Sequence, residues 1–102
     1  MQNKVNDFNK KNFKDRKTPA YARLLDIQSE LGELSKEYLK SSNYGEGEFA
    51  VNEDFKMEYG DVLYSLLSLA NELNLNAEEC LDLAIKKYES RLNKKNNMGS
   101  GR

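Results

Sequence analysis

The chain of 102 residues has no histidine, no tryptophan, one proline and one cysteine. The absence of histidine argues against zinc sites built on imidazole and against di-iron bundles that use Glu-x-x-His. It also means that any general base must be a carboxylate or a water molecule activated by a metal. The single cysteine, Cys80, cannot form an internal disulfide, which favours a reducing compartment. Because Cys80 lies on the apolar side of a predicted helix, we expect a buried, unreactive thiol.

Long apolar runs are also missing. The N-terminus is polar and no run exceeds a few residues, so we expect neither a signal peptide nor a membrane span, and a cytoplasmic location is the default. Apolar residues make up 38% of the chain and charged residues 32%. This balance leaves a single small domain with a marginal core. We therefore expect oligomerisation to supply the missing burial.

Charge is distributed in three blocks along the chain. Residues 1–25 hold seven Lys or Arg against two Asp, residues 26–82 hold three against fourteen acids, and residues 83–102 hold six against one. Solvated faces explain most individual charges. A second interpretation is that basic ends fold over an acidic centre that holds a cation and an anionic ligand. The acidic centre opposes nucleic-acid binding by the basic N-terminal segment, so we expect no nucleic-acid partner.

The acidic centre contains two matched pairs of carboxylates. Residues 57–73 (MEYGDVLYSLLSLANEL) form a strongly apolar helical pattern, with Glu58 and Asp61 spaced i, i+3 at the rim of its apolar face. Glu30 and Glu33 repeat this spacing in SELGEL, beside an apolar stripe. Each pair encloses a glycine directly before its second acid. Since a helical glycine costs about 1 kcal/mol relative to alanine, two matching glycines suggest closely packed backbones there.

The whole chain is predicted to be all-α and to form one domain over residues 1–92. A weak helix over about 3–14 should dock through Phe8 and Phe13, and Thr18 followed by Pro19 is a typical start for a helix that ends near Lys40. Residues 41–47 (SSNYGEG) form the clearest loop. Helices over 53–73, capped by Asn52, and over 77–92 follow, and residues 93–102 are expected to be a disordered tail. The two long helices would form an antiparallel hairpin that brings the two acidic motifs face to face.

Carboxylates gathered in this way repel one another unless a cation lies between them. Oxygen ligands alone suit a hard ion, so we expect Mg²⁺, with Mn²⁺ as a substitute. Magnesium usually acts on substrate phosphates, and Lys87 and Arg91, an i, i+4 pair on the last helix, could neutralise phosphate oxygens. Hydrolysis of a phosphoanhydride is the reaction class that these parts suit best. The alternative for each feature is structural: a charged helix surface for the acids and the basic pair, and simple packing for the glycines.

Together these residues resemble the MazG-like all-α nucleotide pyrophosphohydrolases, which carry an E-x-x-E motif on one helix and an E-x-x-D motif on the next. Here the motifs correspond to Glu30-Leu-Gly-Glu33 and Glu58-Tyr-Gly-Asp61, and the similarity extends over about residues 5–92. The resemblance implies hydrolysis of a nucleoside triphosphate to the monophosphate and pyrophosphate as a house-cleaning reaction. It also implies Mg²⁺ bound by the four acids, and a homodimer or homotetramer in which helices of two chains complete a four-helix bundle.

The last helix departs from the family pattern. The family often has an asparagine two residues before the lysine, where this chain has Ile85. The aromatic residue that would stack on a base is not assigned, and the candidates are Phe13, Tyr44, Phe49 and Tyr59. A non-catalytic helical dimer that binds nucleotide or protein remains the alternative function, and its stability would be indifferent to Mg²⁺ and nucleotide.

Overall fold

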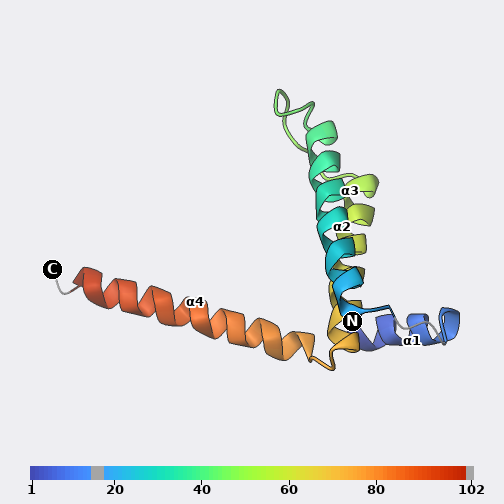
Figure 1. Ribbon diagram of the computed structural model, residues 1–102. Coiled ribbons are helices and arrows are strands. Elements are labelled where there is room, and N and C mark those ends of the chain that lie inside the picture. The colour runs from blue at the N-terminus through green and yellow to red at the C-terminus, as the bar shows by residue number, and fades with distance from the viewer. Residues whose placement is uncertain (15–17, 101–102) are drawn as a thin grey trace.

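The structure is a computed structural model that describes residues 1–14 and 18–100, with the side chains of 97–100 left out. Its described part contains four helices and no strand, in the order α1 (Gln2–Asn12), α2 (Ala20–Ser41), α3 (Glu53–Glu72) and α4 (Ala77–Ser100). Helices α2 and α3 lie side by side, α1 crosses their lower end, and α4 leads away from them (Figure 1). The predicted all-α class and the helical hairpin are confirmed.

The α2–α3 hairpin has well-defined ends that follow from local sequence. The side chain of Asn52 accepts a hydrogen bond from the backbone N–H of Phe55 at 2.8 Å, so the predicted cap of α3 is confirmed. At the start of α2 the prediction is wrong by one position: Pro19 is itself the N-cap residue, with ψ at 146°, and no side chain caps the helix. Between the helices, Gly45 has a φ of 89°, a conformation that suits glycine.

Helix α1 docks on α3 mainly through polar side chains. Its Asn9 bonds Tyr64 and Ser68 of α3, and its Gln2 accepts a hydrogen bond from the backbone N–H of Ala77 at 2.9 Å. Phe8 does contact Tyr64 edge-on, with ring centroids 6.1 Å apart. However, Phe8 and Phe13 are 51% and 40% exposed, so the expected docking through these two rings is only partly realised.

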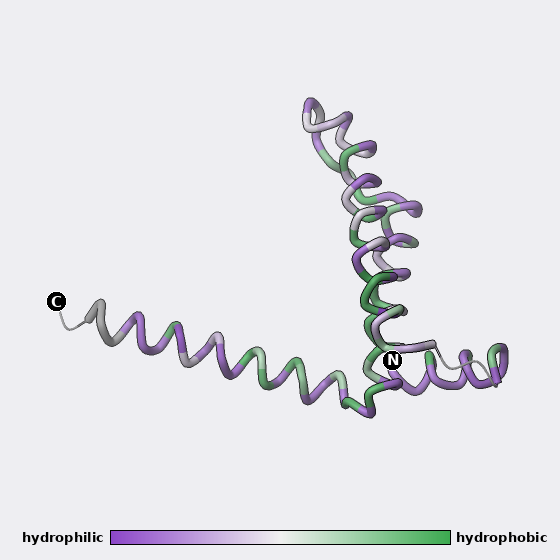
Figure 2. Tube along the Cα trace, in the orientation of Figure 1, coloured by the Kyte–Doolittle hydropathy of each residue, from purple (hydrophilic) through white to green (hydrophobic). Residues whose placement is uncertain are grey.

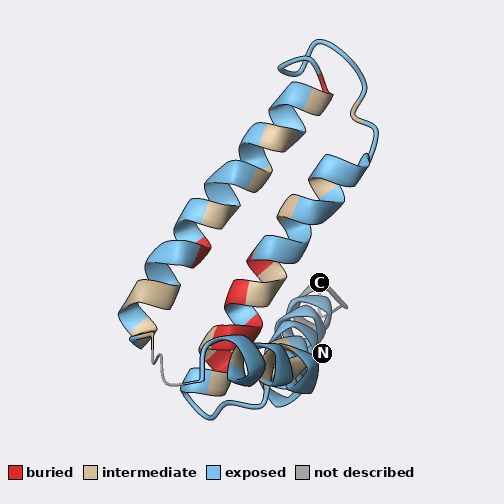
Figure 3. Cartoon of the chain, turned by 90° about the vertical axis from the view of Figure 1, so that its right-hand side faces the viewer, coloured by how far each residue is buried: buried red, intermediate tan, exposed pale blue. Residues whose placement is uncertain are grey.

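The hydrophobic core of one chain is very small. Among the described residues, only Ile27, Val62, Leu67 and Ala70 are buried apolar side chains. The buried positions concentrate in the second half of α3 (Figure 3), where Ser65 and Ser68 are also buried. The sequence predicted a broad buried leucine arc on this helix, but Leu66 and Leu73 are 46% and 49% exposed. The reason is that α2 and α1 cover only part of that arc.

Helix α4 has an apolar stripe that no other element in the described part of the chain covers. Its residues lie exposed or half-exposed, namely Leu81, Ala84, Tyr88 and Leu92, and apolar residues alternate with polar ones along the helix (Figure 2). Cys80 is exposed as well, so the expectation of a buried thiol is wrong.

The last helix also runs further than expected. Residues 93–100, expected to be a disordered tail, continue α4 to Ser100, since no proline interrupts the helix; residues 101–102 lie outside the described part. At its start, the side chain of Asn76 accepts a hydrogen bond from the backbone N–H of Glu79 at 3.0 Å and so caps the helix. None of the helices in the described ranges is long and apolar enough to cross a membrane.

Candidate active site

Three of the four predicted acids meet in the middle of the α2–α3 hairpin. Glu30 comes from α2, and Glu58 and Asp61 come from successive turns of α3. One carboxylate oxygen from each lies within 4.8 Å of the other two. The cluster arises because the two motifs are about equally far from the loop on antiparallel helices. Glu30 and Glu58 are half-buried and Asp61 is exposed, so the cluster remains open to solvent.

The cluster is electrostatically strained. Partial burial raises the pKa of the Glu30 carboxyl, and the charges of Asp61, Glu33 and Asp26 raise it further. The pKa of the Glu58 carboxyl is raised in the same way, first by desolvation and then by the charges of neighbouring acids, above all that of Asp61. No basic side chain forms an ion pair with Glu30, Glu58 or Asp61 in the described part of the chain. A cation is the group that would relieve this repulsion.

Glu33, the fourth predicted acid, lies beside this trio and outside it. Its side chain is exposed, and it is close enough for its charge to raise the pKa values of both Glu30 and Glu58. The arrangement therefore offers three clustered carboxylates and one that is free to act on a neighbouring water or ligand.

The three clustered oxygens lie slightly further apart than the ligands of one divalent cation. Carboxylate oxygens bind Mg²⁺ at about 2.1 Å, which places opposite ligand atoms about 4.2 Å apart. The clustered oxygens are up to 4.8 Å apart, so their side chains would have to turn inward to share one ion. The donor set of oxygen atoms alone suits Mg²⁺ or Mn²⁺.

The two glycines of the motifs do not pack closely within the chain. A Cβ atom built on Gly32 or on Gly60 meets no other atom within 4 Å beyond its own helix. The prediction that they mark a close approach of backbones is therefore wrong for a single chain. Both glycines lie on surfaces that are exposed here.

The structure does not bring the predicted phosphate-binding pair to the carboxylates. Lys87 and Arg91 lie on α4, which projects away from the hairpin (Figure 1). Lys87 is about 15 Å along this helix from Ala77, and its ammonium group lies 4.8 Å from the ring centroid of Tyr88. These two side chains are therefore remote from the acids of their own chain.

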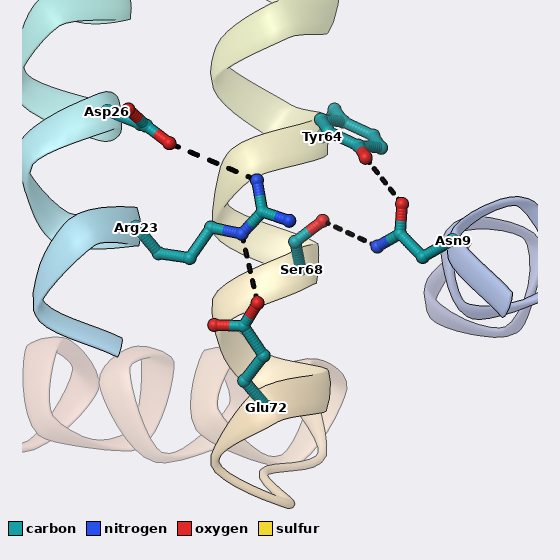
Figure 4. A network of polar contacts seen from close by, with 6 residues as sticks. All are labelled: Asn9, Arg23, Asp26, Tyr64, Ser68 and Glu72. Atoms are coloured by element: carbon teal, nitrogen blue, oxygen red, sulfur yellow. Dashed lines mark hydrogen bonds and ion pairs between the residues drawn. The ribbon is translucent and has the colours of Figure 1, made fainter. Parts of the chain in front are cut away.

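A polar network that sequence reasoning missed lies next to the cluster, between α1, α2 and α3 (Figure 4). Arg23 pairs with Glu72 at 3.0 Å across the hairpin and lies 5.8 Å from the ring centroid of Tyr64. On the other side, Asn9 contacts both Tyr64 and Ser68. A signal was present in the spacing: Arg23 precedes Glu30 by seven residues, and Ser68 follows Asp61 by seven, so each shares a helix face with its acid.

The four aromatic candidates for base stacking are scattered. Phe13 lines the groove beside this network. Tyr44 lies in the loop, Phe49 stacks on Tyr38 with ring centroids 4.2 Å apart, and Tyr59 is 58% exposed on α3. Of the four candidates, Phe13 is the one that lines this groove in the described part of the chain.

Two comparisons with known proteins lead to the same relative. No family model matches the chain. The chain is 37% identical over 82 residues to the uncharacterized protein YpjD of Bacillus subtilis (strain 168), and the match covers 78% of this chain and 72% of that protein. The crystal structure of YpjD from Bacillus subtilis, a proposed pyrophosphatase, is similar with a TM-score of 0.72 and 32% identity, over 88% of this chain and 90% of that one.

Proposed function

The chain belongs to the family of YpjD from Bacillus subtilis, and from this premise we propose that it is a Mg²⁺-dependent nucleotide pyrophosphohydrolase. The reaction is the hydrolysis of a nucleoside or deoxynucleoside triphosphate to the monophosphate and pyrophosphate. The resemblance of the two acidic motifs to those of MazG-like enzymes supports the nucleotide as substrate. The description of the YpjD structure as a proposed pyrophosphatase supports the class of reaction. The physiological role proposed is removal of unwanted nucleotides from the pool.

The observation that carries the proposal is the meeting of Glu30, Glu58 and Asp61 without a basic partner. The three carboxylates share a site in which desolvation and neighbouring charges raise the pKa values of Glu30 and Glu58, and this repulsion destabilises the fold when no cation is present. Titratable side chains that destabilise the fold in this way are typical of functional sites. Bound Mg²⁺ would be held by these three acids, with Glu33 beside them, and would neutralise charge on the phosphates.

The acidic side chains of the protein must handle the proton of the attacking water. Hydrolysis needs a group that takes a proton from the attacking water, and the chain has no histidine to do so. A carboxylate must therefore accept this proton, unless the water is already deprotonated by the metal. Glu33 lies next to the cluster without being one of its three members, which suits it to orient that water.

We also propose that the active form contains at least two copies of the chain. A large apolar area stays uncovered in one copy, including the stripe of α4 and Leu31, Leu66 and Leu73 on the hairpin. Packing α4 of one copy on the hairpin of another would bury both surfaces. In that arrangement Lys87 and Arg91 would serve a site of the second copy, which agrees with their distance from the acids of their own chain.

The test measures pyrophosphate release from nucleoside triphosphates by the purified Glu33→Gln and Asp61→Asn variants. We expect each substitution to abolish Mg²⁺-dependent release while the helical content stays unchanged. Glu46→Gln is the matched control, since Glu46 is an exposed acid of the loop. Full activity of a folded Asp61→Asn variant would contradict the assignment of the site.

A further inference from the structure

A groove of about 840 Å³ lies between α1, α2 and α3. This volume is within the range of about 300 to 1,000 Å³ that is typical of small-molecule sites. Most of its lining residues have polar side chains, and they include five of the six residues drawn in Figure 4, namely Asn9, Arg23, Tyr64, Ser68 and Glu72. The lining also includes the ring of Phe13, which is 40% exposed.

The groove lies further along the same hairpin than the acidic cluster. Along α3, Asp61, Tyr64 and Ser68 share one face, and Ser68 is about 10 Å from Asp61 along the helix axis. Along α2, Arg23 lies on the face of Glu30 and the same distance away. Because the helices are antiparallel, both rows run in the same direction in space, and the Arg23–Glu72 ion pair joins them at 3.0 Å. A triphosphate at the carboxylates would thus extend its nucleoside into the groove.

One amide is held in a defined position in this groove. The side chain of Asn9 accepts a hydrogen bond from the hydroxyl of Tyr64 and donates one to Oγ of Ser68 at 3.2 Å. Ser68 is only 1% exposed, so this anchor is rigidly packed. An asparagine side chain has two acceptor lone pairs and two N–H donors. One lone pair and one N–H of Asn9 therefore remain for a ligand.

A free donor next to a free acceptor is the pattern that pairs with the hydrogen-bonding edge of a nucleobase. We propose that Asn9 is the specificity-determining residue for the base, with Tyr64 and Ser68 as its positioning residues and the ring of Phe13 available to stack on the base. This inference rests on the proposed function for the location of the phosphates. It adds the group that reads the base, and it places that group on α1, outside both acidic motifs.

The inference is tested with two nucleotide pairs, dCTP with dUTP and dATP with dITP, whose members present the donor and the acceptor of the recognised edge in opposite order. Because Tyr64 and Ser68 hold the amide of Asn9 in one orientation, it matches the edge of one member of a pair better than the other. A carboxylate replaces the amide donor by a second acceptor and matches neither order, so Asn9→Asp should lower the preference for the favoured member of whichever pair the protein cleaves. We expect the ratio of kcat/KM between the two members to shift by about 10-fold or more relative to the unsubstituted protein.

Two further variants separate base reading from a structural role. Asn9→Ala should bring the ratio towards one, whereas Asn12→Ala should leave it unchanged, because Asn12 bonds only the carbonyl of Phe8 on its own helix. Partial unfolding lowers both rates together and does not move the ratio. Ratios within twofold of the unsubstituted protein in both Asn9 variants would overturn the inference.

The outcome for the unsubstituted protein distinguishes this inference from the proposed function. If that protein releases no pyrophosphate from these four nucleotides or from any other nucleoside triphosphate, the proposed function fails. The inference is then decided by calorimetric affinities for the same four nucleotides. A shift of the affinity ratio in Asn9→Asp would support it, and equal ratios or absence of binding would overturn it.

Discussion

Replacing Glu30 with glutamine should stabilise the fold in the absence of divalent cations. The glutamine keeps the shape of the side chain and removes a charge whose carboxylate lies within 4.8 Å of those of Glu58 and Asp61. Two like charges at that distance repel by about 0.9 kcal/mol in water, and salt at physiological ionic strength reduces this by about half. Removing the repulsion from both neighbours should therefore raise the free energy of unfolding by about 1 kcal/mol. Glutamine also removes the cost of partly burying a charge, which adds to the same effect.

The assay is thermal unfolding in EDTA near pH 7.5, where about 1 kcal/mol corresponds to a rise of roughly 4 °C or more in Tm for a domain of this size. The raised pKa of Glu30 means that the folded state binds its proton more readily than the unfolded state. The repulsion is therefore present above the raised pKa and disappears as the pH falls below 4.5, the ordinary pKa of a glutamate. The difference in Tm between the Glu30→Gln variant and the unsubstituted protein should therefore decrease as the pH falls. A variant that is less stable than the unsubstituted protein in EDTA, with Glu46→Gln neutral, would refute this reasoning.

Two other predictions concern the fold and the assembly. Asn52→Ala removes the cap of α3 and should cost about 1 kcal/mol, measured by chemical denaturation; a change below about 0.3 kcal/mol would show that the cap is dispensable. Leu81→Glu places a charge on the exposed stripe of α4 and should shift the protein from an oligomer to a monomer in sedimentation experiments, whereas Glu89→Gln on the same helix should leave the mass unchanged. A monomeric unsubstituted protein at micromolar concentration would contradict the proposed assembly.

Local sequence was sufficient to predict most of the secondary structure. The caps at Asn52 and Asn76 act through side chains only a few residues away from the groups they bond, and such short-range chemistry is visible in sequence. The end of α4 was less predictable, because residues 93–96 (NKKN) permit a helix without specifying one.

The acidic cluster was predictable because spacing determines it. An i, i+3 pair on each helix of an antiparallel hairpin can place its acids opposite the other pair, and Glu30, Glu58 and Asp61 do meet. The polar groove was harder to predict, because it depends on where α1 docks. Asn9 approaches Ser68 across 59 positions of sequence, and no local pattern in α1 encodes that contact.

Burial on α4 and at the glycines could not be predicted from one chain. The apolar stripe that includes Leu81 and Tyr88 has the periodicity of a core face, yet no other element in the described part of the chain covers it. Gly32 and Gly60 likewise have open space around them. In the proposed oligomer, a second copy would supply the missing contacts.

The most direct test of the account is pyrophosphate release from a panel of canonical NTPs and dNTPs, dUTP and modified nucleotides, with Mg²⁺ and with EDTA. The account predicts release that requires the metal, is confined to a few nucleotides, and is lost in Asp61→Asn. A folded, oligomeric protein that releases no pyrophosphate from any member of the panel, with Mg²⁺ or with Mn²⁺, would contradict it.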